Sequence, residues 1–285
     1  PSPTGPLHFG SLVAALASFL DARKHRGEWL VRIEDIDPLR ESPGASDRIL
    51  KTLESHSLLW DQSIRYQSER GKPYEQLINQ LVKNKHAYYC PCSRKTLIEN
   101  NGVHGPDCNP PSAQASLPVA IRFRSKDQDY SWDDLLLGPQ SYSAKTPVDD
   151  FVIKRKEGFY AYQLAVVLDD IHQNITHVIR GCDLLEPTAR QLTLFSTLNS
   201  PVPRYGHVPL ATTDRGYKLS KQNNAPAINN HNPQPTLLRA LQFLGQPTEP
   251  DLIHEKVEIV IDWAINHWDR EKVRKVQEIN IELSQ

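Results

Sequence analysis

The stretch PSPTGPLHFGS occupies residues 1–11, and the apolar run LVAALASFL follows it at residues 12–20. The prolines and the glycine predict a stiff turn, and the apolar residues recur at the spacing of one helix face. Gly10 and Ser11 should therefore lie at a helix start, where backbone N–H groups and the helix dipole favour a phosphate. His8 can donate a hydrogen bond to a phosphate oxygen. These features favour a nucleotide site, and the alternative is an ordinary proline-rich loop before an amphipathic helix.

A second short motif, KLSKQ, lies far along the chain at residues 218–222, just after the stretch TDRG at residues 213–216. Lys218 and Lys221 are three residues apart on a loop that follows a glycine. Such a pair suits a triphosphate whose charge shifts during a reaction. Taken alone, the motif is better explained as a solvated basic loop.

Two strand ends carry charged residues. Residues 28–33, EWLVRI, read as a buried parallel strand that is followed by Glu34, and residues 177–180 read as a strand that ends in Arg180. The strand–helix–strand spacing predicts a βαβ unit. Ligands of such folds bind beyond the carboxyl ends of the strands, so Glu34 and Asp35 should lie near residues 1–11.

Together the two motifs resemble the paired signatures of the class I aminoacyl-tRNA synthetases, the histidine–glycine signature and the lysine–serine–lysine signature. Three further stretches are similar to the glutamyl subgroup: RIEDID at 32–37, Tyr162 with AVVLDD at 165–170, and VIRG at 178–181. The resemblance runs from Pro1 to about Phe243. It implies an α/β protein, with a class I synthetase-type Rossmann nucleotide-binding fold, a zinc-bearing insertion and a small helical C-terminal region.

The chain divides into four segments on this reading. They are the first half of the Rossmann catalytic domain (1–82), an insertion with a zinc site (83–148), the second Rossmann half (149–212), and the lysine-signature loop with the helical C-terminal region (213–285). Helices are expected over 47–59, 73–81, 185–198, 235–244 and 257–268, with another that begins at Tyr162. Further strands are expected over 119–124 and 149–154.

The resemblance implies ATP-dependent activation of an amino acid, in which the protein supplies positioning and charge stabilisation. His8, Lys218 and Lys221 are then the catalytic residues that stabilise the phosphates as charge builds up. ATP would be bound by His8, Gly10, Ser11 and Lys221, and Mg²⁺ should accompany it. Each of these residues taken singly could be an ordinary polar surface residue.

L-Glutamate, the implied substrate, carries one ammonium and two carboxylates. Glu34 can pair with the ammonium, and Arg180 can bind a carboxylate through a bidentate fork. Tyr162 would orient the ligand, and Pro1 and Ser2 occupy positions that the family uses against the amino acid. The alternative for Glu34 and Arg180 is a structural ion pair with each other.

Four residues predict a zinc site: Cys90, Cys92, His104 and Cys108. They supply the number of soft or borderline donors that tetrahedral Zn²⁺ prefers. In the related short enzymes a tyrosine stands where this chain has His104, which is a better zinc ligand. The alternative is a set of buried or idle thiols. We expect Cys182, far away in the sequence, to be structural.

The charge balance is close to neutral, with 33 Lys and Arg against 34 Asp and Glu and a formal net charge of −1. Binding of RNA must therefore depend on a local basic surface. Residues 83–126 hold seven Lys or Arg and two Asp or Glu. No apolar run approaches the ~20 residues of a transmembrane helix. With no leader recognisable either, we expect a cytoplasmic protein that does not bind membranes and acts as a monomer.

The sequence ends 63 residues after Gln222, whereas a full glutamyl-tRNA synthetase continues into a large helical anticodon-binding domain. The chain therefore resembles a truncated paralogue that places glutamate on the queuosine base in the anticodon of tRNA(Asp). One alternative is a minimal glutamyl- or glutaminyl-tRNA synthetase that charges the tRNA 3′ end. Two others are a nucleotidyltransferase that makes a cofactor from ATP and a catalytically inactive zinc-bearing RNA-binding paralogue.

Overall fold

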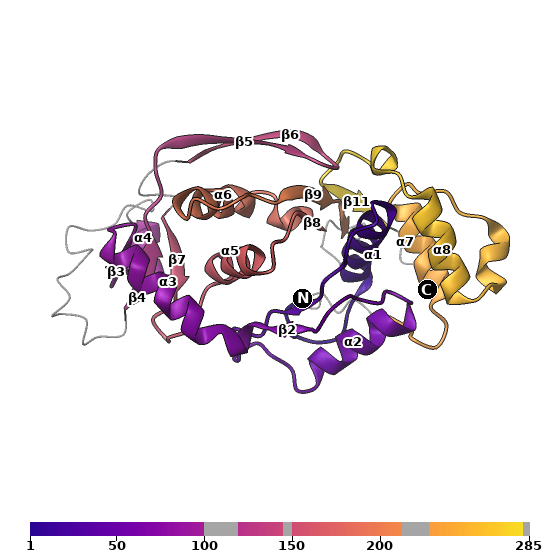
Figure 1. Cartoon of the computed structure of the whole chain (residues 1–285), viewed down its shortest axis with the longest axis horizontal. Coiled ribbons are helices and arrows are strands. Elements are labelled where there is room, and N and C mark those ends of the chain that lie inside the picture. The colour runs from indigo at the N-terminus through magenta and orange to yellow at the C-terminus, as the bar shows by residue number, and fades with distance from the viewer. Residues whose placement is uncertain (100–118, 145–149, 213–227, 282–285) are drawn as a thin grey trace.

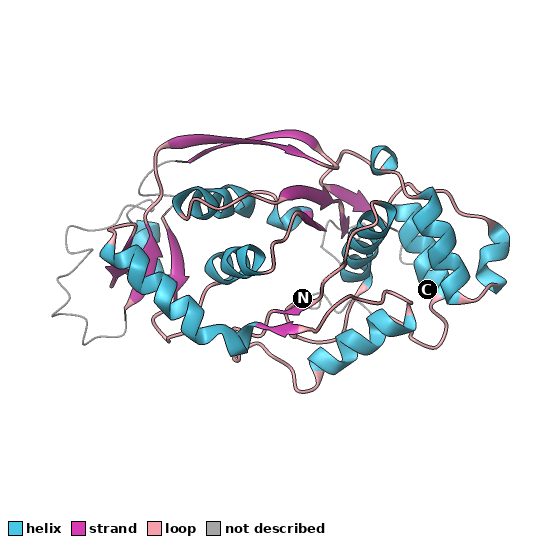
Figure 2. Cartoon of the chain, viewed as in Figure 1, coloured by secondary structure: helices cyan, strands magenta, loops and turns pink. Residues whose placement is uncertain are grey.

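The computed structural model describes residues 1–99, 119–144, 150–212 and 228–281 (Figure 1). The molecule is elongated, and helices and short strands alternate along it (Figure 2). None of the helices in the described ranges is both long and apolar enough to cross a bilayer. Four of the predicted site residues lie outside the described ranges, namely His104, Cys108, Lys218 and Lys221.

The first part of the chain forms a helix and a small parallel sheet. Helix α1 (Phe9–Lys24) follows the proline-rich turn, as the sequence predicts. Strand β1 (Arg32–Ile33) is shorter than the expected strand over 28–33, and it pairs in parallel with β2 (Arg65–Tyr66). The connection holds α2 (Ala45–Ser55), and after β2 come η1 (Gln67–Arg70) and α3 (Gly71–Lys83).

The insertion contributes two strands of an antiparallel sheet and a long hairpin, and the third strand of the sheet follows the insertion in the sequence. The sheet has the order β3-β4-β7, formed by β3 (Ala87–Cys90), β4 (Ala120–Phe123) and β7 (Phe151–Lys154), with α4 (Arg94–Glu99) after β3. The hairpin consists of β5 (Gln128–Asp134) and β6 (Gly138–Ala144), and the sequence reading did not predict it. Figure 1 shows it running above α6 and β9, from the β3–β4–β7 sheet towards the opposite end of the molecule.

The second parallel pair belongs to the later part of the chain. Its elements are α5 (Tyr162–His172), β8 (His177–Gly181), η3 (Cys182–Leu184), α6 (Pro187–Thr197) and β9 (Arg204–Val208). Strands β8 and β9 are parallel and are joined through α6, which makes a βαβ unit. The sequence predicts β8 and α6, but it does not predict β9.

The C-terminal region is mostly helical, as expected, but it also returns to the sheet. It contains α7 (Gln234–Phe243), η5 (Pro250–His254), α8 (Val257–His267) and η6 (Arg270–Lys272). Strand β11 (Glu278–Asn280) then pairs in parallel with β10 (Leu210–Thr212). We expected the segment after Val257 to be a helical tail, and β11 corrects that expectation, because backbone pairing with β10 overrides the local helical pattern.

Two main apolar cores hold these parts together. The larger core packs α1 against α7 and α8, with Leu12, Leu16 and Leu20 of α1 fully buried. The second core packs α3 and α5 onto the β3–β4–β7 sheet around Tyr74 and Phe123. Helix α1 therefore buries one face in the C-terminal helices while its N-terminus remains available to the cleft described below.

A buried ion pair ties α1 to the end of the chain. Asp21 is 2% exposed, and its carboxylate accepts hydrogen bonds from Arg270 Nε (2.6 Å), Arg270 Nη2 (2.8 Å) and Trp268 Nε1 (3.1 Å). Burial opposes ionisation, but the bonds from Arg270 and Trp268 outweigh it and lower the pKa of Asp21. The pair therefore fastens the C-terminal segment onto the last turns of α1.

We expect Asp21→Asn to lower the free energy of unfolding by about 3 kcal/mol at neutral pH, because it leaves Arg270 without its counter-charge. The folded pKa of Asp21 lies below the unfolded value of about 3.9, so the ionised group stabilises the fold above that pH. This contribution is lost as the pH falls through the folded pKa, and the difference between wild type and variant should shrink below about pH 4.

Urea unfolding at several pH values measures this difference. Asp262→Asn, on the exposed face of α8, is the matched control and should leave stability within about 0.5 kcal/mol of wild type. A difference for Asp21→Asn that stays the same from pH 7 to pH 3 would contradict the assignment.

Candidate active site

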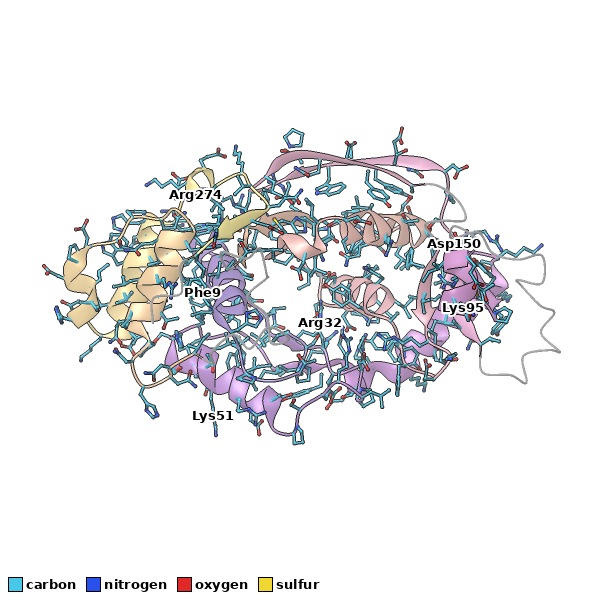
Figure 3. The ribbon with its side chains drawn as sticks, turned by 180° about the vertical axis from the view of Figure 1, so that it is seen from behind. Phe9, Arg32, Lys51, Lys95, Asp150 and Arg274 are labelled. Atoms are coloured by element: carbon cyan, nitrogen blue, oxygen red, sulfur yellow. The ribbon has the colours of Figure 1, made fainter. Side chains whose placement is uncertain are left out.

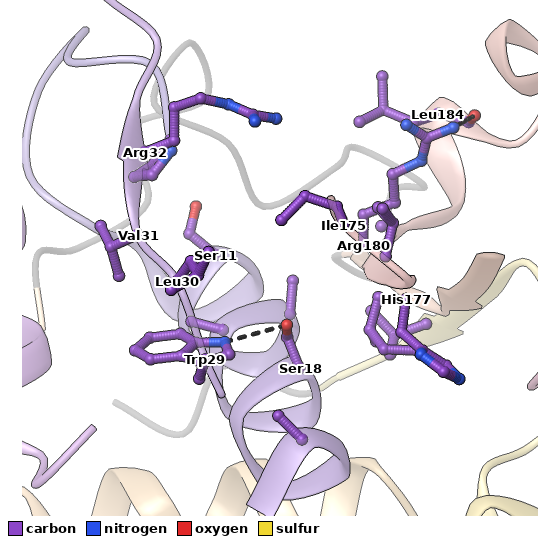
Figure 4. Close-up of a pocket in the computed structure, with 18 of the residues that line it drawn as sticks. Ser11, Ser18, Trp29, Leu30, Val31, Arg32, Ile175, His177, Arg180 and Leu184 are labelled. Atoms are coloured by element: carbon purple, nitrogen blue, oxygen red, sulfur yellow. Dashed lines mark hydrogen bonds between the residues drawn. The ribbon is translucent and has the colours of Figure 1, made fainter. Parts of the chain in front are cut away.

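A cleft of about 1320 Å³ lies between α1, β1 and β8. In Figure 4, Val31 and Arg32 form one wall, Arg180 and His177 form the facing wall, and Ser11 and Ser18 of α1 lie at the base. The part of the cleft that follows α1 is lined by small apolar side chains. The polar part lies beyond the carboxyl ends of β1 and β8, which is where ligands bind in folds of this type.

Eight of the residues that the sequence singles out line this one cleft. They are Pro1, Ser2, His8, Gly10, Ser11, Glu34, Tyr162 and Arg180. They come from the proline-rich turn, the start of α1, the end of β1, the start of α5 and the end of β8. The fold therefore brings together residues that are up to 179 positions apart in the chain.

His8 is the N-cap of α1. Its Nδ1 accepts a hydrogen bond from the backbone N–H of Ser11 (3.3 Å), and its Nε2 lies 2.9 Å from the Ser11 hydroxyl. The sequence predicted that the backbone N–H groups of this helix start would face a ligand. The backbone N–H group of Ser11 instead donates to the side chain of the N-cap residue, His8.

Glu34 and Arg180 do not pair with each other. Ser2 Oγ lies 3.5 Å from Glu34 Oε2, and Glu34 forms no ion pair with any described residue. Arg180 is 8% exposed, and its four hydrogen bonds go to His207 Nε2 (3.1 Å), Gln191 Oε1 (2.8 Å), Thr188 Oγ1 (2.8 Å) and the Leu184 carbonyl (3.2 Å). Within the described residues, the alternative of a Glu34–Arg180 ion pair is thus wrong.

The partners of Arg180 also limit how it can bind a ligand. Four of its five N–H groups are engaged, which leaves one N–H of Nη1. The bidentate fork expected from the sequence is therefore not available in this arrangement. A carboxylate could accept one hydrogen bond and benefit from the full positive charge.

Comparisons with known proteins decide the family. Residues 1–249 match the family described as tRNA synthetases class I (E and Q), catalytic domain. The chain is 52% identical to the glutamyl-Q tRNA(Asp) synthetase of Colwellia psychrerythraea, over 99% of this chain and 93% of that protein. It is 48% identical to the protein of that name from Photobacterium profundum, over 98% of this chain and 90% of that protein.

The chain belongs to the glutamyl-Q tRNA(Asp) synthetase family. The family that the sequence motifs predict is thereby confirmed. The fold is similar to that of the glutamate-tRNA synthetase from Elizabethkingia anophelis, with a TM-score of 0.82 at 24% identity, covering 99% of this chain and 67% of that one. That likeness supports the α/β class I fold.

Tyr162, at the start of α5, is half-buried. Burial, and secondarily the charge of Glu34, raises the pKa of its hydroxyl. Tyr162 is therefore protonated at neutral pH. Its hydroxyl forms no hydrogen bond with another described residue, so it can donate one into the cleft.

The sequence reading did not single out Arg32 and Asp170 as site residues, although both line the cleft. Arg32 Nη2 donates to Asp170 Oδ1 (2.7 Å), and Arg32 Nη1 donates to Gln173 Oε1 (2.8 Å). Burial raises the pKa of Asp170, although the Arg32 guanidinium opposes that shift. Helical periodicity could have found Asp170 and Gln173, because Tyr162, Val166, Asp170 and Gln173 share a face of α5.

We expect His8→Ala to lower the free energy of unfolding by about 1 kcal/mol, because α1 loses its N-cap. His8→Asn should restore most of that loss, since an asparagine oxygen can accept the same backbone N–H. Urea unfolding of the three proteins measures the effect. Equal stabilities for wild type and His8→Ala would show that the cap contributes nothing.

Proposed function

We propose that this chain activates L-glutamate with ATP and transfers the glutamate to the queuosine base in the anticodon of tRNA(Asp). It is a class I aminoacyl-tRNA synthetase-like ligase by family. The names of its relatives, which cover nearly the whole chain, support the acceptor. The class I catalytic domain supports the activation step.

The observation that carries the amino-acid part is a pair of opposite charges in the cleft, neither of which makes a direct ion pair with a described residue. Within the described residues, Glu34 has no cationic partner and the buried guanidinium of Arg180 has no carboxylate partner. A charged group that makes no direct ion pair attracts an opposite charge, so a ligand that supplies both opposite charges would be stabilised here. Glutamate meets this requirement, with its ammonium at Glu34, one carboxylate at Arg180 and Tyr162 as a further donor.

The second carboxylate of glutamate is the nucleophile in the activation step. One of its oxygens attacks the α-phosphorus of ATP, and the bond from that phosphorus to the bridging oxygen breaks, so that pyrophosphate leaves with the electron pair. The product is glutamyl-adenylate. His8, Gly10 and Ser11 at the start of α1 would lie against the phosphates, where the helix dipole favours negative charge. We propose that Lys218 and Lys221 add positive charge, and that Mg²⁺ accompanies the ATP.

In the transfer step a nucleophile on the queuosine base attacks the carbonyl carbon of the adenylate, and AMP leaves. Charging of a tRNA 3′ end is the second candidate, because the chain also resembles the glutamate-tRNA synthetases in fold. We favour the anticodon, since the relatives at 44–52% identity carry the glutamyl-Q tRNA(Asp) name. We further propose a monomer that acts in the cytoplasm.

We also propose a zinc ion in the insertion, bound by Cys90, Cys92, His104 and Cys108. Cys90 is the last residue of β3 and is buried, and Cys92 follows it two residues later. Two sulfur donors at one strand end fit half of a tetrahedral zinc site. No group of three or more potential ligands occurs within the described residues, and the other two donors lie outside them. The ion would stiffen the insertion.

Elemental analysis of the purified protein should find one zinc per chain, and Cys92→Ser should lose most of it. Cys182→Ser is the matched control, because burial raises the pKa of that thiol to about 12 and it lies in η3 rather than in the insertion. Zinc retained in full by Cys92→Ser, or lost equally from Cys182→Ser, would contradict the ligand set.

The function is tested with labelled glutamate, ATP and total tRNA from cells with and without queuosine. We expect label on the queuosine-containing tRNA alone, and glutamate-dependent exchange between ATP and pyrophosphate without any tRNA. Arg180→Ala should lose the exchange.

Label on both tRNA preparations would favour charging of the 3′ end. Absence of exchange with glutamate in the wild-type protein would reject the activation step itself.

A further inference from the structure

The charge that balances Arg180 is not beside it in the cleft. His207 lies between Arg180 and the carboxylate of Asp134, which is the last residue of β5. His207 Nε2 is 3.1 Å from Arg180 Nε, and His207 Nδ1 is 2.5 Å from Asp134 Oδ2. The side chains of Asp134 and His207 are both fully buried. The three groups form a continuous hydrogen-bonded chain from a carboxylate through an imidazole to a guanidinium, which we call the Asp134–His207 relay.

The directions of these hydrogen bonds fix the state of His207. Arg180 Nε always carries a hydrogen, so His207 Nε2 must accept, and the ring proton must sit on Nδ1 and point to Asp134. His207 is then neutral. Burial outweighs the attraction of Asp134 and lowers the pKa of His207, in agreement with a neutral ring.

Hydrogen bonds hold the Asp134 carboxylate so that one of its oxygens faces the imidazole of His207. Its Oδ1 accepts three backbone hydrogen bonds, from Leu136 (3.1 Å), Leu137 (3.0 Å) and His207 (3.0 Å). This leaves Oδ2 for the imidazole. Burial opposes ionisation, but the bonds from His207 and the backbone outweigh it and lower the pKa of Asp134. An ionised carboxylate in this place attracts the guanidinium through the imidazole without occupying the cleft.

The tip of the β5–β6 hairpin packs against β9, and this contact places Asp134 beside His207. The Leu135 N–H donates to the Tyr205 carbonyl (2.8 Å), and Leu136 is 1% exposed. A Cβ atom on Gly206 would lie 2.6 Å from Ile179 Cδ1 and 3.2 Å from Leu135 Cβ, so there is no room for a side chain there. Tyr205, the neighbour of Gly206, places its ring 4.7 Å from Arg180 Cζ.

We propose that Asp134 and His207 are positioning residues for the amino-acid site, and that the β5–β6 hairpin is the outer support of that site. They hold the Arg180 guanidinium in place and supply its counter-charge at a distance. The carboxylate of the substrate is then free to take the remaining N–H. This inference rests on the proposed role of Arg180 in binding glutamate.

Asp134→Asn is the most direct test. The three backbone N–H groups hold the amide oxygen at the Oδ1 position, so the new NH₂ group faces His207 Nδ1. The imidazole must then move its proton to Nε2, where it opposes the N–H of Arg180 Nε, much as a carboxamide enforces the wrong tautomer in a serine protease triad. We expect the KM for glutamate in pyrophosphate exchange to rise about 10- to 100-fold. The KM for ATP should change less than about twofold.

Asp150→Asn is the matched control. Asp150 is also buried, and its carboxylate accepts hydrogen bonds from two residues of the insertion, Tyr88 Oη (2.7 Å) and the Ser125 N–H (2.6 Å). Figure 3 shows it at the insertion end of the molecule, away from Arg32 of the cleft. Both variants should lose stability, but Asp150→Asn should leave the KM for glutamate unchanged. An equal rise of the KM for glutamate in the two variants would overturn the proposal. Such a result would show that any destabilisation of this part of the protein raises the KM.

Two substitutions of His207 provide a second route if Asp134→Asn does not fold. His207→Phe removes both ring nitrogens and should raise the KM for glutamate as Asp134→Asn does. His207→Gln keeps one donor and one acceptor and should recover part of the loss. A KM for glutamate that is unchanged in His207→Phe would overturn the proposal.

A spectroscopic measurement requires no substrate, and so its result does not depend on the proposed function. ¹⁵N NMR of histidine-labelled wild-type protein, with His207 assigned by its loss in His207→Phe, should show a neutral ring protonated at Nδ1. A ring protonated at Nε2 or at both nitrogens would overturn the relay. If the relay is present and wild-type protein shows no exchange with glutamate, the proposed function fails instead.

Discussion

The cleft depends on a guanidinium that is buried at the end of β8 without an adjacent carboxylate. Arg180 is held by neutral acceptors from α6, η3 and β9, and its counter-charge lies one side chain further away in the β5–β6 hairpin. A carboxylate in direct contact would have neutralised it and removed the reason to bind a ligand there. The surrounding elements therefore keep a cation oriented and leave its charge available to the cleft.

Helix α1 connects this site with the rest of the molecule. Its first turn, capped by His8, lies in the cleft, its apolar face is buried against α7 and α8, and Asp21 in its later part binds Arg270. The helix start is thus fixed by contacts at the other end of the same helix. The proposed phosphate site at the start of α1 depends on these contacts, because the position of the backbone N–H groups is set by the whole helix.

The insertion takes part in the site as well as in the outer sheet. The sheet that its strands β3 and β4 form with β7 packs with α3 and α5. Its hairpin reaches over α6 to β9 and places Asp134 beside His207. In sequence the hairpin lies between the two halves of the nucleotide fold. In the structure its tip lies against β9, at the far end of the hairpin from the β3–β4–β7 sheet (Figure 1).

The sequence alone predicted the family, the start of α1, the strand that carries Arg180 and eight of the residues that line the cleft. These follow from local patterns: a turn before an apolar helix, charged residues at strand ends, and motifs that resemble the class I synthetase signatures. The partners of Arg180, the Asp134–His207 relay, the Arg32–Asp170 pair and the return of β11 to β10 were decided by the tertiary structure. These contacts join residues that are between 4 and 138 positions apart. No local periodicity encodes which of the many possible acceptors a buried guanidinium will meet.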